Sequence, residues 1–80
     1  MYVVKHKEYD IYWTNSWPSG WSLTYEINKS KIYTRRPLSR IRYYNSASGQ
    51  RNNRHLVEFQ GLVINLTEFE IRPITINLVE

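Results

Sequence analysis

The feature that most constrains the fold is a two-residue alternation of apolar and polar side chains. β-Branched and aromatic residues recur at every second position, in short runs that are separated by turn residues. The clearest run covers residues 21–27, where Trp21, Leu23, Tyr25 and Ile27 share one face. Because successive side chains of a strand point to opposite faces, this pattern predicts half-buried β-strands. No internal repeat and no amphipathic helical run of useful length is found, so we expect an all-β chain.

Runs of this kind cover residues 2–5, 9–13, 21–27, 31–35, 40–45, 55–60, 62–66 and 74–79. The segments between them are predicted to be turns or loops, the longest being 14–20 and a mobile loop over 45–53. Gly61 interrupts an apolar run and predicts a bulge or a sharp bend. Residues 66–69 fit one helical turn as well as a strand.

Eighty residues predict a single domain, residues 1–80, with a thin core. The chain has no cysteine, so neither a disulfide framework nor a Cys-type zinc site contributes. About five short antiparallel strands at this spacing predict a small barrel. A strand over 56–59, a turn near 66–68 and a closing strand at 69–71 favour an SH3-like barrel, with an OB-type barrel as the alternative.

Charge is strongly segregated along the chain. Eight of the eleven basic residues and no acid lie between Lys29 and Arg54. The remaining residues carry three basic side chains and all seven acids, so a local +8 stands against −4 elsewhere. Such asymmetry indicates a polyanion or an acidic protein surface as the partner.

The basic residues are expected to form a two-stranded ribbon. If strands 31–35 and 40–45 pair, their basic faces lie side by side, with two tyrosines between the charges. Arginine grips phosphate bidentately and aromatic rings stack on bases, so these residue types favour nucleic-acid binding. The candidate binding residues are Lys31, Tyr33, Arg35, Arg36, Arg40, Arg42, Tyr44, Arg51 and Arg54. The alternative interpretation is a solvated face that keeps a small protein soluble.

Three tryptophans, Trp13, Trp17 and Trp21, form a second cluster. We expect Trp13 and Trp21 in the core, because buried aromatic rings remove a large apolar area from water. Trp17 lies beside Pro18 in a predicted loop and is an additional candidate for binding a partner.

A third group, His6, Glu8 and Asp10, shares one face of a predicted strand and has the donor types of a metal site. Lys5 and Lys7 alternate with them, which is more typical of a solvated edge strand. We therefore predict no metal site and no cofactor. With no glycine-rich phosphate loop, no Gly-x-Ser-x-Gly elbow and no cysteine nucleophile, we expect a protein that is not an enzyme.

Two hypotheses follow. The first is a nucleic-acid-binding module of low sequence specificity. The second is a small accessory protein of phage or viral type, which binds and modulates or inhibits a larger host protein through the same basic and aromatic surface. Carbohydrate binding through Trp17 is a weaker third option. We expect neither a signal peptide nor a membrane-spanning segment, and we expect a cytoplasmic monomer or homodimer.

Overall fold

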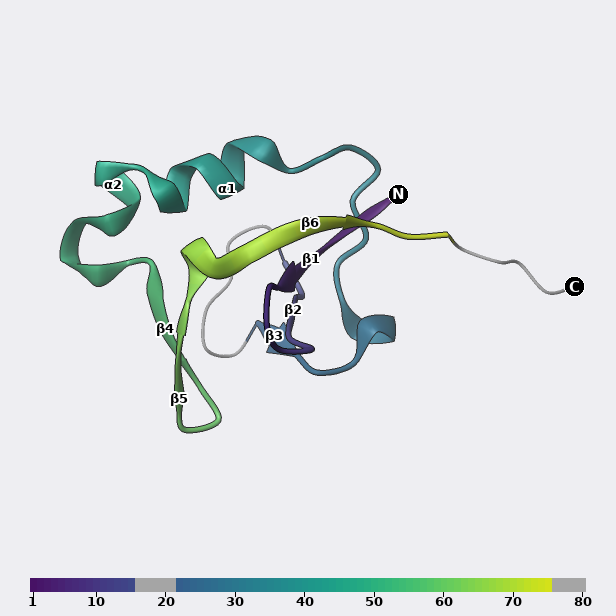
Figure 1. Ribbon diagram of the computed structural model, residues 1–80, viewed down its shortest axis with the longest axis horizontal. Coiled ribbons are helices and arrows are strands. Elements are labelled where there is room, and N and C mark those ends of the chain that lie inside the picture. The colour runs from purple at the N-terminus through teal and green to yellow at the C-terminus, as the bar shows by residue number, and fades with distance from the viewer. Residues whose placement is uncertain (16–21, 76–80) are drawn as a thin grey trace, which may run out of the picture.

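Strand β1 (Tyr2–His6) lies at the centre of the main sheet. The computed structural model describes residues 1–15 and 22–75. Within them, four antiparallel strands follow the order β3-β2-β1-β6. The other three strands are β2 (Tyr12–Trp13), β3 (Leu23–Thr24) and β6 (Phe69–Pro73). The first and last strands of the described chain are therefore neighbours, as Figure 1 shows.

A separate two-stranded sheet is formed by β4 (Leu56–Phe59) and β5 (Leu62–Asn65). Its turn is Gln60-Gly61, where both residues have positive φ, 51° and 83°. Positive φ at both central residues is the requirement of a tight type I′ hairpin turn. The sharp bend predicted at Gly61 is therefore confirmed. The helical turn predicted after this hairpin is also present, as η3 (Leu66–Glu68).

The helices lie together on one side of the sheet (Figure 1). Helix α1 (Leu38–Asn45) is followed by α2 (Ala47–Gln50) and by the 3-10 turn η2 (Arg51–Asn53). A further 3-10 turn, η1 (Ile27–Lys29), follows β3. The strand predicted over 40–45 is therefore wrong, and so is the mobile loop predicted over 45–53, which contains α2 and η2.

Ser46 explains how two helices fit into so few residues. Its backbone N–H and its hydroxyl both donate to the carbonyl oxygen of Tyr43, which ends α1. The same hydroxyl oxygen accepts the N–H of Gly49 and so caps the start of α2. A serine at this position is a standard helix cap, and Pro37, which has no backbone N–H to donate, stands directly before α1. These two residues are the local signals that the alternation of 40–45 concealed.

Tertiary packing is the main reason that residues 38–45 form a helix and not a strand. Tyr44 is buried, and its ring meets that of Trp13 edge-on with centroids 5.8 Å apart. Trp13 is fully buried and also contacts the ring of Phe69 at 5.8 Å. The prediction that Trp13 is a core residue is confirmed, whereas Trp17 and Trp21 lie outside the described residues. The core also contains Val4, Ile11, Leu23, Tyr33, Phe59, Ile64 and Leu66.

Other strand predictions hold in part. Residues 2–5, 55–60 and 62–66 each overlap a strand, and 9–13 contributes only β2. The run 21–27 contributes only β3, and its later members Tyr25 and Ile27 are exposed. Residues 31–35 form one bridge, Tyr33 with Tyr2, through two 2.8 Å hydrogen bonds. Ile74 and Thr75 are not in a strand, and the rest of the predicted last strand lies outside the described residues.

The β-rich class is confirmed, but the barrel is not. Within residues 1–15 and 22–75, β4 and β5 pair only with each other, so the strands do not close into an SH3-like or OB-type ring. None of the helices in these ranges is long and apolar enough to cross a membrane.

Candidate functional site

An open cleft at the start of α1 brings three arginines together. The cleft has a volume of about 270 Å³, and no carboxylate lines it. We call it the arginine cleft; its lining residues are Tyr33, Thr34, Arg35, Arg36, Pro37, Ser39 and Arg40. Sequence analysis singled out four of these residues but did not place them in a cavity.

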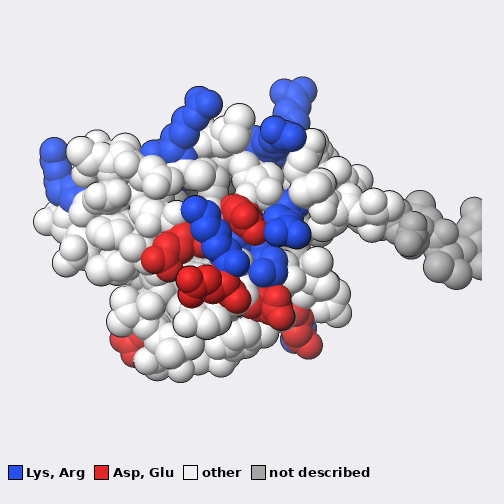
Figure 2. All heavy atoms as spheres, in the orientation of Figure 1, with Lys and Arg blue, Asp and Glu red and all other residues white. Residues whose placement is uncertain are grey.

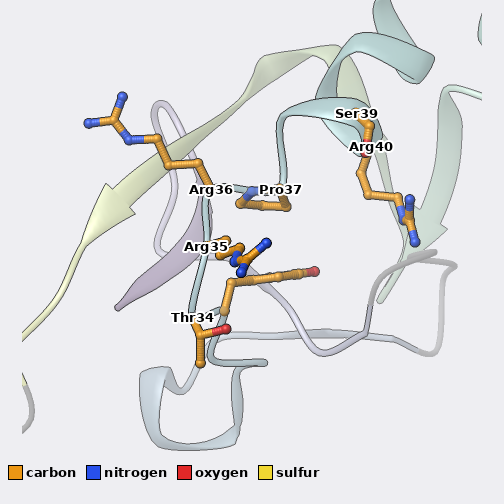
Figure 3. Close-up of a pocket in the computed structure, with 7 residues that line it drawn as sticks. Thr34, Arg35, Arg36, Pro37, Ser39 and Arg40 are labelled. Atoms are coloured by element: carbon orange, nitrogen blue, oxygen red, sulfur yellow. The ribbon is translucent and has the colours of Figure 1, made fainter.

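The segment before α1 and the first helical turn form the two sides of the cleft. Figure 3 shows Arg35 and Pro37 on one side of the view and Arg40 on the other, with the guanidinium of Arg40 directed away from Arg35. The guanidinium of Arg36 points away from the cleft in the same view. It lies 5.6 Å from the centroid of the Tyr2 ring, a cation–π distance, so only part of Arg36 lines the cleft.

The start of α1 adds to the positive potential of the cleft. No side chain caps this helix end, and its first turn contains no acid. The unpaired N–H groups at the start of a helix carry a partial positive charge, and they favour anions. Ser39 and Arg40 line the cleft from this first turn.

Tyr33 contributes a buried wall rather than an exposed stacking surface. Its side chain is 9% exposed, and its hydroxyl donates to the carbonyl oxygen of Asn15 at 3.2 Å. The ammonium group of Lys31 lies 5.6 Å from the centroid of its ring. Tyr44 is also buried and packs on Tyr43 as well as Trp13. The prediction that Tyr33 and Tyr44 stack on bases is therefore wrong, because neither ring is available.

Burial also fixes the ionisation state of Tyr44. Removal from water raises the pKa of its phenol above the ordinary 10.0, with smaller contributions from Tyr43 and Tyr33, while Arg40 acts in the opposite direction. At neutral pH the side chain is an uncharged core residue.

The remaining basic residues extend from the cleft along the helices. Arg42 lies exposed on α1, Arg51 opens η2, and Arg54 follows η2. The predicted two-stranded basic ribbon is therefore wrong, because one of its strands is a helix. The six arginines before, on and after the helices are called here the helical basic edge: Arg35, Arg36, Arg40, Arg42, Arg51 and Arg54.

Three of the acids pair with other basic residues. In the described residues, the ion pairs join Lys5 to Asp10, Lys29 to Glu26, and Arg72 to Glu70. The 2.7 Å contact with Glu26 raises the pKa of Lys29, mainly through the hydrogen bond, so this lysine belongs to a pair rather than to a free basic surface. Figure 2 shows acidic and basic side chains interspersed over the sheet, whereas basic side chains along the α1–α2 side project without acidic neighbours.

His6 is a structural residue. It is 2% exposed, and its Nδ1 accepts the backbone N–H groups of Glu8 and Tyr9 at 3.1 and 3.3 Å. Its Nε2 lies 3.3 Å from a carboxylate oxygen of Glu68. Asp10 pairs instead with Lys5, so the trio His6, Glu8 and Asp10 does not converge. No group of three metal-ligating side chains is present in the described part of the chain.

Comparisons with models of protein families, with curated proteins and with solved structures found no match to this chain.

Proposed function

We propose that the protein binds nucleic acid through the helical basic edge. The observation that carries this proposal is an arginine-rich surface with an open, acid-free cleft at one end. Arginine binds phosphate oxygens through a planar fork of N–H donors, and such contacts dominate the affinity of proteins for nucleic acid.

Phosphate contacts position a protein on its ligand but carry no sequence information. With Tyr33 and Tyr44 buried, the surface lacks the stacking residues expected from the sequence. We therefore propose low sequence specificity, now based on phosphate contacts alone. The cytoplasm, where such partners occur, remains the proposed location.

A titration tests this function. Fluorescently labelled single- and double-stranded DNA and RNA are titrated with the protein at about 50 and 200 mM salt, and anisotropy is measured. We expect micromolar or tighter binding at low salt, and a loss of orders of magnitude across this range if six contacts form. Arg72→Ala serves as the matched control, because Arg72 is basic but pairs with Glu70 at 2.9 Å. Absence of binding at low salt would contradict the proposal.

A second candidate is docking on a larger protein, as in an accessory protein that modulates a host machine. The observation that favours it is the exposure of apolar side chains on both faces of the β4–β5 hairpin. Leu56, Leu62 and Val63 are 39%, 49% and 72% exposed. The strand register places Leu56 and Val63 on one face and Leu62 on the other, and apolar side chains left exposed favour contact with a partner. Failure of the nucleic-acid titration would make this candidate the preferred one.

A further inference from the structure

We propose that a second, apolar cavity beside the start of α1 is a docking site for an acidic peptide segment of a partner protein. The segment presents one branched aliphatic side chain to the cavity and a neighbouring carboxylate to Arg36. We call this cavity the apolar groove; its volume is about 320 Å³, and its lining residues are Tyr2, Arg36, Leu38, Ile41, Ile71 and Pro73. Among the described residues it shares only Arg36 with the arginine cleft, so the inference goes beyond nucleic-acid binding.

The apolar groove is the open end of the sheet face that carries the core. Directly opposite residues of an antiparallel pair share a face. The register pairs Val4 with Ile71 on this face. Two residues further along, it pairs Tyr2 with Pro73. Val4 is fully buried, whereas Tyr2 is half-buried and Pro73 is exposed. The core therefore covers one end of this face, and Leu38 of α1, which is 43% exposed, borders the other end.

Arg36 supplies the charge of the apolar groove. Its guanidinium points away from the arginine cleft (Figure 3) and lies 5.6 Å from the centroid of the Tyr2 ring. A guanidinium that rests on a ring keeps its N–H donors in its own plane. The described residues provide these donors with no hydrogen bond or ion pair, and no carboxylate among those residues lines the groove. A carboxylate of a partner can therefore bind this guanidinium bidentately.

The lining favours an aliphatic side chain over a nucleobase. Apart from Tyr2 and Arg36, the described lining residues carry alkyl groups: Leu38, Ile41, Ile71 and Pro73. The edge of a nucleobase carries donors as well as acceptors, and the side chains of the described lining include no amide or carboxylate oxygen to accept from it. A leucine or isoleucine side chain has no such requirement, and its burial removes apolar surface from water on both sides of the contact.

The size of the apolar groove indicates an anchor of a longer chain and not a free ligand. Its volume of about 320 Å³ is close to the lower end of small-ligand sites, about 300 Å³. Because Leu38 and Pro73 are exposed at its border, the groove does not enclose its occupant, and most of the contact must come from the rest of the partner. Arg35, next to Arg36, is exposed as well, so the local positive potential favours a segment with several acids.

Titration with short peptides tests the inference. Amide chemical shifts of the isotope-labelled protein are followed by NMR up to about 1 mM peptide, the weak end of specific binding. Three peptides share one length and one glycine–serine background. The first has a leucine between two aspartates, the second has serine in place of the leucine, and the third has asparagines in place of the aspartates. We expect the first to bind about tenfold more tightly than either of the others, because each of these lacks the buried side chain or the charge-assisted contact.

Variants of the protein assign each preference to its side chain. Leu38→Ala should reduce the preference for leucine over serine, and Arg36→Ala should remove the preference for aspartate over asparagine. Arg36→Lys keeps the charge but loses the bidentate fork, so it should retain only part of the second preference. Ile27→Ala is the matched control, because Ile27 is an aliphatic residue of similar exposure, 49%, outside the described lining, and it should leave both preferences unchanged. Thermal melting verifies that each variant is folded.

Four results would overturn the assignment. Equal affinity for the three peptides would exclude an aliphatic anchor beside a carboxylate, and absence of shifts with any peptide would exclude the docking site. If hexanoate displaces the first peptide at the same concentration as the peptide itself, the groove takes a small carboxylate and not a protein segment. If a single-stranded oligonucleotide shifts the amides of the groove and loses affinity in Leu38→Ala, the occupant is a nucleic acid.

Discussion

Side chains of the basic segment, residues 29–54, differ in their exposure to solvent. Arg35, Arg42 and Arg54 are exposed, whereas Tyr33 and Tyr44, which are interspersed with the arginines in the sequence, are buried. The tyrosines attach the basic segment to the core, and these three arginines remain exposed to solvent. One stretch of sequence therefore supplies both core and surface.

Tyr44 makes the stability of the protein sensitive to alkaline pH. Its pKa is raised in the folded state by burial, so folding favours the protonated phenol. A raised folded pKa contributes stability that is present below pH 10 and is lost as pH rises through the folded pKa. We expect the free energy of unfolding to fall above pH 10, with less decline in Tyr44→Phe.

Urea denaturation between pH 8 and 11 measures this effect, and tyrosinate absorbance reports the ionisation itself. Tyr25→Phe is the control, because Tyr25 is 46% exposed. An alkaline decline that Tyr44→Phe leaves unchanged, or that Tyr25→Phe alone removes, would contradict the assignment.

At the junction of α1 and α2, Gly49 packs directly against the backbone of α1. A Cβ atom built at Gly49 would collide with the carbonyl group of Tyr43 and lie 2.9 Å from the Cα atom of Tyr44. Both neighbours are backbone and cannot rotate aside. The glycine therefore permits α2 to turn back against the end of α1.

Two glycine substitutions distinguish packing from backbone strain. Gly49→Ala should destabilise the protein by about 2 kcal/mol or more, because overpacking against backbone forces the helices apart. Gly61→Ala should cost about 1 kcal/mol, since its site is open and only the positive φ of 83° opposes a side chain. Chemical denaturation measures both. Equal losses would mean that the α1–α2 contact is not as tight as described.

Among the described residues, the charges on the sheet differ from those on the helical side. The sheet carries paired acids and bases, and the helical side carries the arginines of the helical basic edge (Figure 2). Such separation steers a polyanion toward one face at low ionic strength. The exposed members Arg42 and Arg54 of the helical basic edge can be altered with little effect on the core.

The double substitution Arg42→Ala with Arg54→Ala tests this separation. Each residue lost as a phosphate contact should reduce the slope of log affinity against log salt concentration by about one, so the double variant should lose about two. Its melting temperature should stay close to that of the unaltered protein, because both side chains are exposed. A marked loss of stability would show that these arginines support the fold, contrary to the structure described here.

Sequence alone determined the elements whose signals are local. The alternation in 2–5 and 55–60 predicted strands that are present, and Gly61 predicted the bend between β4 and β5. Turn chemistry and two-residue periodicity depend on adjacent residues, so they can be recognised without knowledge of the fold. The segregation of basic residues was equally evident, because counting charges needs no coordinates.

Only the tertiary structure decided what residues 38–54 form. Arg40, Arg42 and Tyr44 alternate like a strand, but the burial of Tyr44 against Trp13 and the cap at Ser46 favour helix. Long-range packing of this kind outweighs weak local propensity. The arginine cleft followed from the same choice, since α1 brings Arg40 opposite Arg35. The sequence determined which charges the protein carries, and the packing of one tyrosine on one tryptophan decided where they meet.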